Sequence, residues 1–414
     1  MNRLRARSAV SPLHGRFDTA SDALPTVDDL VAAERPEEPM HCLRPAAVKA
    51  ASRAFVDAFP GAVMYAVKCN PEPVILRAVR AGGVGHFDCA SIAEVRLVRQ
   101  MFADAAIHFM HPVKARSAIR EAWAQHGVRD FVLDTKEELA KILHEVAATG
   151  VPGALGLIVR LALPKGDAVL DLSGKFGASP ADAAALLRAA RPHADRLGVS
   201  FHVGSQCLDP LAWRTALALT GDAIRAAVVP IDVIDVGGGF PVAYPEVEPP
   251  PLGAFIAEIE AGVEQLGLAG VELWVEPGRA LVAGGASVVV QVHQRRANAL
   301  YVNDGVFGSL ADAGALGFRY PVRLVRPEGT PSDACAEFSL FGPTCDSADR
   351  MRGPFLLPAD VMEGDWIEIG QLGSYGACMR TAFNGFDRAR LVEVRDAPLV
   401  GTGHATLPAM REAA

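Results

Sequence analysis

A short strand-like run followed by a helix-like stretch recurs eight times between about residues 60 and 280. The strand-like runs are rich in β-branched and aromatic residues and read VMYAVK, GHFDCAS, AIHFM, DFVLD, LGLIVRLAL, VSFHVGS, VIDVGGG and LWVEPG. Ala-, Leu- and Arg-rich stretches such as PVILRAVRAG and KEELAKILHEVAATG separate them. Eight alternations predict a parallel sheet closed as a (β/α)8 barrel, with an open doubly wound sheet as the alternative.

The pattern changes after residue 285, where long helical periods become few. The runs SVVVQVHQ, ALYVND, CAEFSLFG and DWIEIG are strand-like and predict a mainly β C-terminal domain. We therefore expect an N-terminal segment at 1–37 that is partly disordered or joins the β domain. A barrel at 38–284 and the β domain at 285–414 follow it.

Polar residues gather at the ends of the predicted barrel strands. They are Lys68, Asp88, Asp134, Arg160, His202, Gly237, Gly238, Gly239 and Glu276. The C-terminal ends of barrel strands form one face, which carries the active site in enzymes of this architecture. So many polar groups on one face favour a site over the chance polarity of strand ends.

Lys68 lies in YAVKCNP, an apolar run that stops at one lysine before Asn70 and Pro71. Burial lowers the pKa of a lysine, so we expect Lys68 to be a nucleophile towards an aldehyde near neutral pH. The alternative is a lysine whose stem passes the strand end and places its ammonium in water.

Two other motifs suit an anionic ligand with an aromatic ring. DVGGGFP places Gly238 and Gly239 where successive backbone amides can cradle a phosphate, although a flexible turn would use the same glycines. EPGR places Glu276 beside Arg279, either as an exposed ion pair or as partners for a ring nitrogen and a phosphate. An aldehyde, a phosphate and a pyridine nitrogen together describe pyridoxal 5'-phosphate.

Composition limits the classes of binding partner and the cellular compartment that we expect. A net charge of −8 over 414 residues disfavours nucleic-acid binding, and no apolar run approaches the roughly 18 residues of a membrane span. Seven scattered cysteines without a CxxC pair favour neither disulfides nor a metal centre and fit a reducing cytoplasm. The Arg-rich start lacks an apolar core, so a secretory signal is not expected.

These motifs also carry a family resemblance over nearly the whole chain. In order they are YAVKCNP, FDCAS with Glu94, LDLSGKFGAS, HVGSQ, DVGGGFP, EPGRALVA, YVNDGVFGS, FGPTCDSAD and GSYGACMRTAFNGF. The chain resembles the fold-type III pyridoxal-phosphate decarboxylases, which combine an alanine-racemase-like barrel with a C-terminal β domain. Several of these stretches resemble ornithine/lysine decarboxylases more than diaminopimelate decarboxylases.

The resemblance implies a role for individual residues. Lys68 would bind the cofactor aldehyde, Asp88 and Arg160 would line the pocket, His202 would stack on the ring, and Glu276 would contact its nitrogen. The implied phosphate ligands are Ser205, Gly238, Gly239, Arg279 and Tyr375. Cys345 would donate a proton to the substrate carbon, and Asp346 would meet the distal amine across a homodimer interface, which shares each active site between two subunits.

One stretch departs from the family. Eukaryotic ornithine decarboxylases carry a Tyr-Asp pair after YVNDGVYGS, whereas this chain reads LADAGALGFRYPVR, with Asp312 earlier in the loop. Asp346, Asp312 or a water is then left to hold the distal amine. The implied reaction is decarboxylation of L-ornithine to putrescine for polyamine biosynthesis, with L-lysine to cadaverine as the runner-up. Racemisation and a non-enzymatic binding role are the alternatives from other classes.

Overall fold

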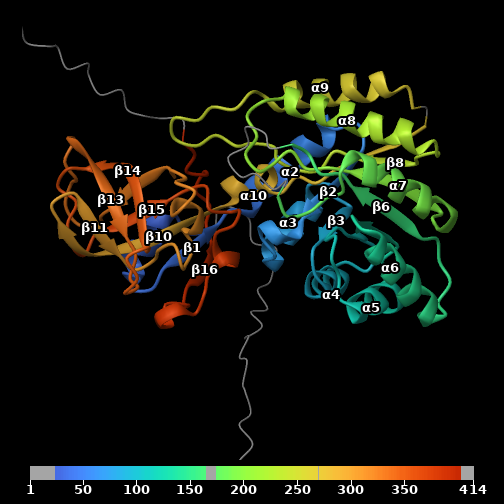
Figure 1. Ribbon diagram of the computed structural model, residues 1–414. Helices are drawn as coiled ribbons and strands as arrows, with labels where there is room; N and C mark the ends of the chain where they lie inside the picture. The colour runs from blue at the N-terminus through green and yellow to red at the C-terminus, as the bar shows by residue number, and fades with distance from the viewer. Residues whose placement is uncertain (1–23, 165–173, 269, 402–414) are drawn as a thin grey trace, which may run out of the picture.

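In the computed structural model, which describes residues 24–164, 174–268 and 270–401, eight parallel strands close into a barrel (Figure 1). The barrel strands are β2 (Ala62–Ala66), β3 (His86–Cys89), β4 (Ala106–Phe109), β5 (Asp130–Leu133), β6 (Gly156–Arg160), β7 (Arg196–Ser200), β8 (Val233–Asp235) and β9 (Glu272–Val275). The barrel prediction is confirmed and the open sheet is excluded. The run VSFHVGS was placed too late, because β7 already ends at Ser200 and His202 lies in the loop that follows.

Helices surround the barrel, each following a strand apart from α2, which precedes β2. They are α2 (Pro45–Ala58), α3 (Pro73–Ala81), α4 (Ile92–Met101), α5 (Arg116–His126), α6 (Lys136–Thr149), α7 (Pro180–Ala190), α8 (Leu211–Ala227), α9 (Leu252–Leu266) and the short α10 (Arg279–Val282). Ser91 and Thr135 start α4 and α6 by accepting hydrogen bonds from backbone N–H groups three residues on.

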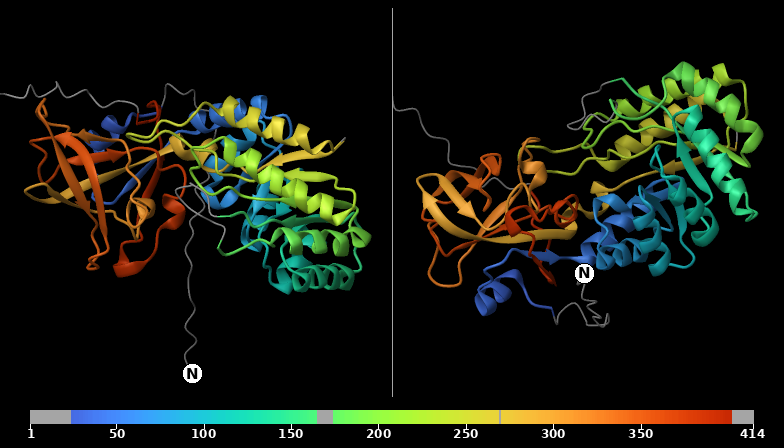
Figure 2. Two further views of the ribbon diagram at one scale, coloured as in Figure 1. Left: turned by 45° about the horizontal axis from the view of Figure 1, so that its top comes forward. Right: turned by 60° about the horizontal axis from the view of Figure 1, so that its bottom comes forward.

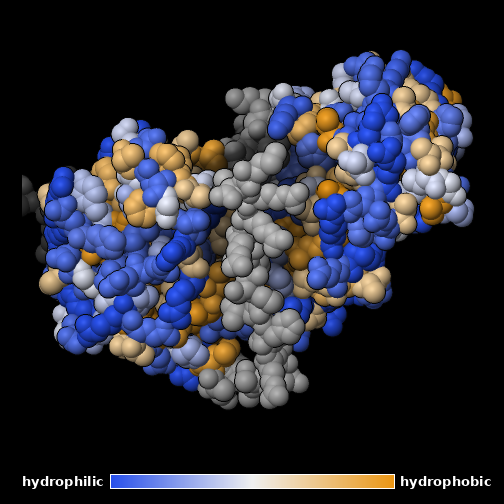
Figure 3. All heavy atoms as spheres, turned by 90° about the horizontal axis from the view of Figure 1, so that it is seen from below, coloured by the Kyte–Doolittle hydropathy of each residue, from blue (hydrophilic) through white to orange (hydrophobic). Residues whose placement is uncertain are grey.

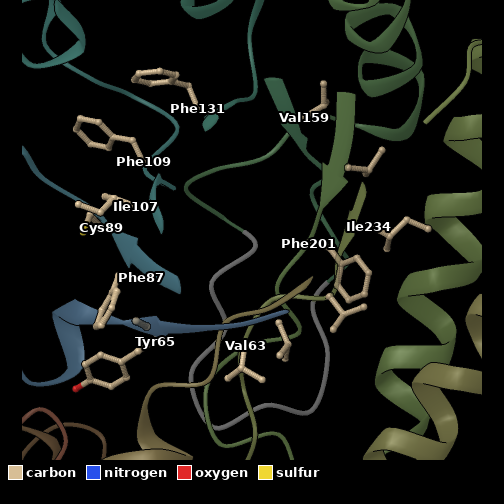
Figure 4. Packing of buried hydrophobic residues seen from close by; sticks show 14 of the residues in the cluster. Val63, Tyr65, Phe87, Cys89, Ile107, Phe109, Phe131, Val159, Phe201 and Ile234 are labelled. Atoms are coloured by element: carbon tan, nitrogen blue, oxygen red, sulfur yellow. The ribbon is translucent and has the colours of Figure 1, made fainter. Parts of the chain in front are cut away.

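Alternation along the strands separates two sets of side chains. One set packs between strands and helices and includes Tyr65, Phe87, Phe109 and Phe131 (Figure 4). The other set fills the barrel interior: Met64, Met110, Val132, Ile158, Val233 and Trp274. Residues at the strand ends in phase with this second set point into the barrel mouth, which positions the candidate site.

A mainly β lobe stands beside the barrel, as predicted (Figures 1 and 2). Its strands are β1 (Met40–Leu43), β10 (Ala286–Arg296), β11 (Ala299–Val302), β12 (Val322–Val325), β13 (Cys335–Phe341), β14 (Arg350–Pro358), β15 (Trp366–Ile369) and β16 (Arg390–Glu393). The sheet runs β12-β15-β10-β11-β13-β14, and β1 joins it by pairing antiparallel to β10 and parallel to β16.

The N-terminal part of the described chain belongs to this lobe. Helix α1 (Val27–Glu34) packs Val27 and Val31 against Trp366 of β15. Strand β1 lies within the segment 38–284 that the sequence assigned to the barrel, yet it pairs in the sheet because the apolar MHCL run completes the edge beside β10. Residues 1–23, and 170–173 of the LDLSGKFGAS motif, lie outside the described residues.

The surface of the molecule is mostly hydrophilic, as expected when the apolar cores of the barrel and the sheet lie inside. Seen from below, both lobes are mainly hydrophilic, with hydrophobic residues more frequent near the junction between them (Figure 3). Among the helices of residues 24–164, 174–268 and 270–401, none is long and apolar enough to cross a membrane.

Candidate active site

Lys68 stands in a tight turn at the barrel mouth. Strand β2 ends at Ala66, and a single 3-10 turn, Val67–Cys69, redirects the chain before Pro71. The Tyr65 hydroxyl donates to the Asn70 carbonyl at 3.0 Å, which fixes the turn from below. The Lys68 Nζ lies 3.1 Å from Asp88 Oδ2, with 44% of the lysine side chain accessible and Asp88 buried. Lys68 therefore faces the mouth rather than bulk solvent outside the barrel.

The electrostatics of Lys68 contradict the expected low pKa. Burial is the largest single influence and lowers the pKa of Lys68, as expected. The Asp88 carboxylate, 3.1 Å away, is the largest opposing influence, and the pKa of Lys68 lies above that of a free lysine. The sequence revealed the burial but not how close the carboxylates would lie. Without a bound aldehyde, the Lys68 ammonium is therefore paired with the Asp88 carboxylate.

Glu276 follows β9 and points into the mouth beside Lys68. The residue is 8% exposed, and burial, followed by the neighbouring Asp235 and Asp88, raises the pKa of Glu276 well above its usual range. Burial therefore favours the protonated carboxyl, which can hold a proton against a ring nitrogen.

His202 lies in the loop after β7 and is uncharged. Burial, then Arg160 and Lys68, hold the pKa of His202 well below its usual range. Its Nδ1 accepts a hydrogen bond from the Gly204 backbone N–H at 3.0 Å, which fixes the ring orientation. A neutral, oriented imidazole offers a flat face to an aromatic ligand.

Glycines after β8 bring the backbone close to these groups. A Cβ at position 238 would lie 2.5 Å from the Glu276 carbonyl oxygen and 3.1 Å from His202 Nε2. Gly239 has φ +114°, a conformation that side chains disfavour, and a Cβ there would meet the Gly204 carbonyl at 2.4 Å. Ser205 is half-buried on the facing loop. The turn is thus built on glycine, as a backbone anion cradle requires.

Arg279 begins α10 and is buried among aromatic rings. Its Nη1 donates to the Tyr244 hydroxyl at 2.9 Å and its Nη2 to Asp312 Oδ2 at 3.0 Å. Its Nε is buried and has no hydrogen-bond partner among the described residues. The Asp312 carboxylate, one candidate for a substrate amine, is therefore already engaged by Arg279.

Tyr375 comes from the β lobe and closes the mouth on the lysine side. Its backbone N–H donates to the Cys69 carbonyl at 2.9 Å, and its ring lies 5.1 Å from the Arg279 guanidinium carbon. The Cys69 thiol donates to the Tyr375 hydroxyl at 3.0 Å. The Asn70 amide also donates to the Gly373 carbonyl at 2.8 Å, so the lysine turn and the β lobe are hydrogen-bonded together.

Cys345 and Asp346 lie on the exposed loop between β13 and β14. The Cys345 N–H donates to Asn384 Oδ1 at 3.1 Å, and Asp346 Oδ1 accepts from the Ala348 N–H at 2.8 Å. Buried Asp349 holds this loop, accepting from the Thr344 hydroxyl at 2.7 Å and the Val306 N–H at 2.8 Å. Within the described part of the chain, no hydrogen bond or ion pair joins Cys345 or Asp346 to the barrel groups.

Of the two remaining predicted residues, Asp134 supports a loop and Arg160 lies near the pocket. Asp134 Oδ2 accepts from the Gly177 N–H at 2.9 Å, so this carboxylate braces the loop after β6. Arg160, the last residue of β6, is half-buried and lies near His202 and Glu276.

The donor set suits pyridoxal phosphate. A lysine for the aldehyde, a protonated carboxyl for the ring nitrogen and a neutral imidazole face lie at one mouth. The glycine turn and the unpaired Nε of Arg279 offer donors to a phosphate. Among the described residues, no group of three or more His, Cys, Asp or Glu side chains could hold a metal ion.

Two contributors were missed from the sequence. Asp235 is fully buried beside Glu276, and Tyr244 binds Arg279. An aspartate in the last position of an apolar strand, two residues before the three glycines, was a signal for the first. Tyr244 lies in a long proline-rich loop and carried no comparable signal.

Comparisons with known proteins agree with this geometry. The model for the pyridoxal-binding domain of the pyridoxal-dependent decarboxylases matches residues 45–283, and that for their C-terminal sheet domain matches residues 280–373. "Decarboxylase flvG" of Aspergillus flavus is 32% identical over 79% of this chain and 78% of that protein. The "lysine/ornithine decarboxylase" of Selenomonas ruminantium is 32% identical over 81% of this chain and 84% of its own length.

A solved structure resembles the whole two-lobed chain. The arginine decarboxylase of Paramecium bursaria Chlorella virus, bound to agmatine, superposes with a TM-score of 0.77 at 26% identity, covering 89% of this chain and 99% of that one.

Proposed function

The chain belongs to the pyridoxal-dependent decarboxylase family, and we propose that it decarboxylates a basic L-amino acid, L-ornithine first, to give putrescine for polyamine synthesis. One observation carries the proposal: Lys68, paired with Asp88, shares the barrel mouth with Glu276 and neutral His202. Family relatives named for lysine, ornithine and arginine support the basic class of substrate.

In this proposal the barrel residues bind and orient the cofactor. Lys68 holds its aldehyde, Asp88 keeps the lysine nitrogen charged and placed, and His202 lies against its ring. Phosphate binding falls to Ser205, Gly238, Gly239, Arg279 and Tyr375, while Arg160 lines the pocket. Buried groups fixed by hydrogen bonds lose little entropy on binding.

The bound pyridoxal phosphate supplies an electron sink for the electron pair left when CO2 departs. Glu276 keeps a proton at the ring nitrogen, which strengthens that sink. Cys345 then returns a proton to the substrate carbon, so that the amine product and CO2 balance the amino acid consumed. A racemase would retain the carboxyl group, and a non-enzymatic relative would have no need of Lys68, Glu276 and Arg279 together.

We assign the distal amine of the substrate to Asp346 rather than to Asp312. Asp312 is buried and already accepts from Arg279, whereas Asp346 is exposed. Because no hydrogen bond or ion pair within the described residues joins Asp346 or Cys345 to their own barrel mouth, we propose that they complete the site of a second copy in a homodimer. Two equivalent sites follow from a two-fold arrangement.

Release of CO2 from L-ornithine, L-lysine, L-arginine and meso-diaminopimelate tests the function directly. We expect the highest kcat/KM with ornithine, followed by lysine. CO2 release only from arginine or diaminopimelate would overturn the substrate assignment. An inverted amino acid without CO2 would overturn the reaction.

A further inference from the structure

Asp235 and Glu276 end neighbouring barrel strands and point to the same side. Asp235, the last residue of β8, lies opposite Trp274 of β9, and Glu276 follows two residues later on the same face. Two backbone hydrogen bonds clasp the strand ends: Val236 N–H to the Trp274 carbonyl and Glu276 N–H to the Gly237 carbonyl, each at 2.9 Å. The two carboxyls are therefore held together by rigid backbone.

The hydrogen bonds of Asp235 leave one oxygen without a donor. Its Oδ1 accepts from the Gly237 N–H at 2.9 Å, while its Oδ2 is buried and unpartnered among the described residues. The Glu276 carboxyl follows the end of the neighbouring strand, and after burial the largest contribution to its raised pKa comes from Asp235. An ionised carboxylate has no hydrogen to donate, so the orphaned Oδ2 can gain a partner from Glu276 only if one of the two carboxyls carries a proton.

We propose that Asp235 is a positioning residue: it shares one proton with Glu276 and so fixes the Glu276 carboxyl in the orientation that faces the cofactor ring. This inference rests on the proposed role of Glu276. If Asp235 served only to accept from the Gly237 N–H, its second carboxyl oxygen would be more stable in contact with water. Instead, the whole Asp235 side chain is excluded from solvent.

The charges around the pair favour a retained proton. Asp88 of β3 and His108 of β4 face Asp235, while Asp88, Lys68 and Arg160 face Glu276. Burial raises the pKa of Asp235 to about 6. Two like charges in one buried site titrate as a pair, so the second ionisation is strongly disfavoured.

The pair predicts a pH-dependent stability that needs no cofactor. Both groups have a folded-state pKa above the unfolded value, so their contribution is complete below about pH 4 and is lost as pH rises through the folded values. In Asp235→Asn, the amide can accept from Gly237 and donate to Glu276 without titrating. We expect its Tm relative to wild type to rise between pH 5 and pH 8 by about 2 °C or more.

Asp130→Asn is the matched control, because Asp130 is also a buried interior carboxyl but lies at the opposite end of the barrel. Burial raises the pKa of Asp130, but His108 Nδ1 at 3.0 Å and Arg196 Nη1 at 3.4 Å outweigh it and hold the pKa below its usual range. Its contribution to stability is complete above about pH 4, so D130N should lower Tm by an amount that stays constant between pH 5 and pH 8.

Measuring Tm from pH 5 to pH 8 on the cofactor-free wild type, D235N, E276Q, the double variant and D130N tests the proposal. We expect the pH-dependent gains of D235N and E276Q to be clearly less than additive in the double variant. Additive gains, or a Tm difference for D235N that does not vary with pH, would overturn the shared proton. E276Q alone still decides the matter if D235N does not fold, because it should show the same pH-dependent gain.

Positioning is tested separately with pyridoxal phosphate bound. The pH dependence of the cofactor's visible absorbance should shift in D235N and remain that of wild type in D130N. An unshifted profile in D235N would overturn the positioning role. Absence of decarboxylase activity would count against the proposed function, while the cofactor-free Tm result would remain as it was.

Discussion

The barrel and the β lobe present their candidate groups in opposite ways. In the barrel, Asp88, Glu276 and Arg279 are buried at strand or helix ends and anchored by the backbone. In the β lobe, Cys345 and Asp346 stand exposed on a hairpin loop, whereas Tyr375 and Asp312 contact groups of their own barrel. One chain thus brings most of the proposed cofactor groups together, whereas the proposed substrate groups Cys345 and Asp346 lie on an exposed loop. This contrast is the reason for proposing that the site is completed by a second subunit.

The largest loss of turnover is expected when Lys68, in the barrel mouth, is replaced. Lys68→Ala should lower turnover by at least about 10³-fold, because it removes the group that holds the cofactor aldehyde. Steady-state CO2 release measures the loss, with exposed Lys49→Ala as the control. Borohydride reduction of the wild type followed by peptide mapping should label Lys68. A label on another lysine would contradict the assignment.

The division between lobes is tested by mixing two inactive proteins. If Cys345 acts on the partner's barrel, then Lys68→Ala mixed with Cys345→Ala restores one intact site in each hybrid dimer. Random exchange makes about half of the dimers hybrid, so activity should approach roughly a quarter of wild type. Exchange is verified independently with differently tagged copies. No recovery despite exchange would mean that each chain completes its own site.

The smallest effect concerns the support of the exposed loop. Asp349→Asn should cost about 1–3 kcal/mol of unfolding free energy by weakening bonds to Thr344 and Val306. Because that loop carries Cys345, turnover should fall about tenfold while cofactor affinity stays unchanged. Denaturant unfolding, CO2 release and cofactor titration measure the three quantities. Asp360→Asn, elsewhere in the β lobe, is the control and should leave turnover intact. Unchanged turnover in Asp349→Asn would separate the loop from catalysis.

Local patterns sufficed for the barrel but not for the sheet. Each barrel strand pairs with the next along the chain, so the alternation of strand and helix already contains the topology. Strand β1 pairs with strands much later in the sequence, and no local pattern specifies such a partner. The short MHCL run was consequently assigned to the wrong lobe.

Within the site, too, features set by the local sequence were predictable, and features set by contacts between distant segments were not. Lys68, His202 and the glycine turn were identifiable because each residue type has a particular chemistry at a strand end. The pKa of Lys68, the pairing of Asp235 with Glu276 and the engagement of Asp312 by Arg279 depend on distances between separate elements. Those distances follow only from the closed barrel and its contact with the β lobe.

The pairing of β1 has a consequence for synthesis on the ribosome. Met40 lies opposite Arg390 in β16, so the first strand to leave the exit tunnel finds one of its partners almost at the end of translation. All eight barrel strands emerge well before β16, and domains generally fold as units during synthesis. The apolar MHCL strand must therefore wait with open edges while the barrel forms, a period in which nascent-chain chaperones would protect it from aggregation.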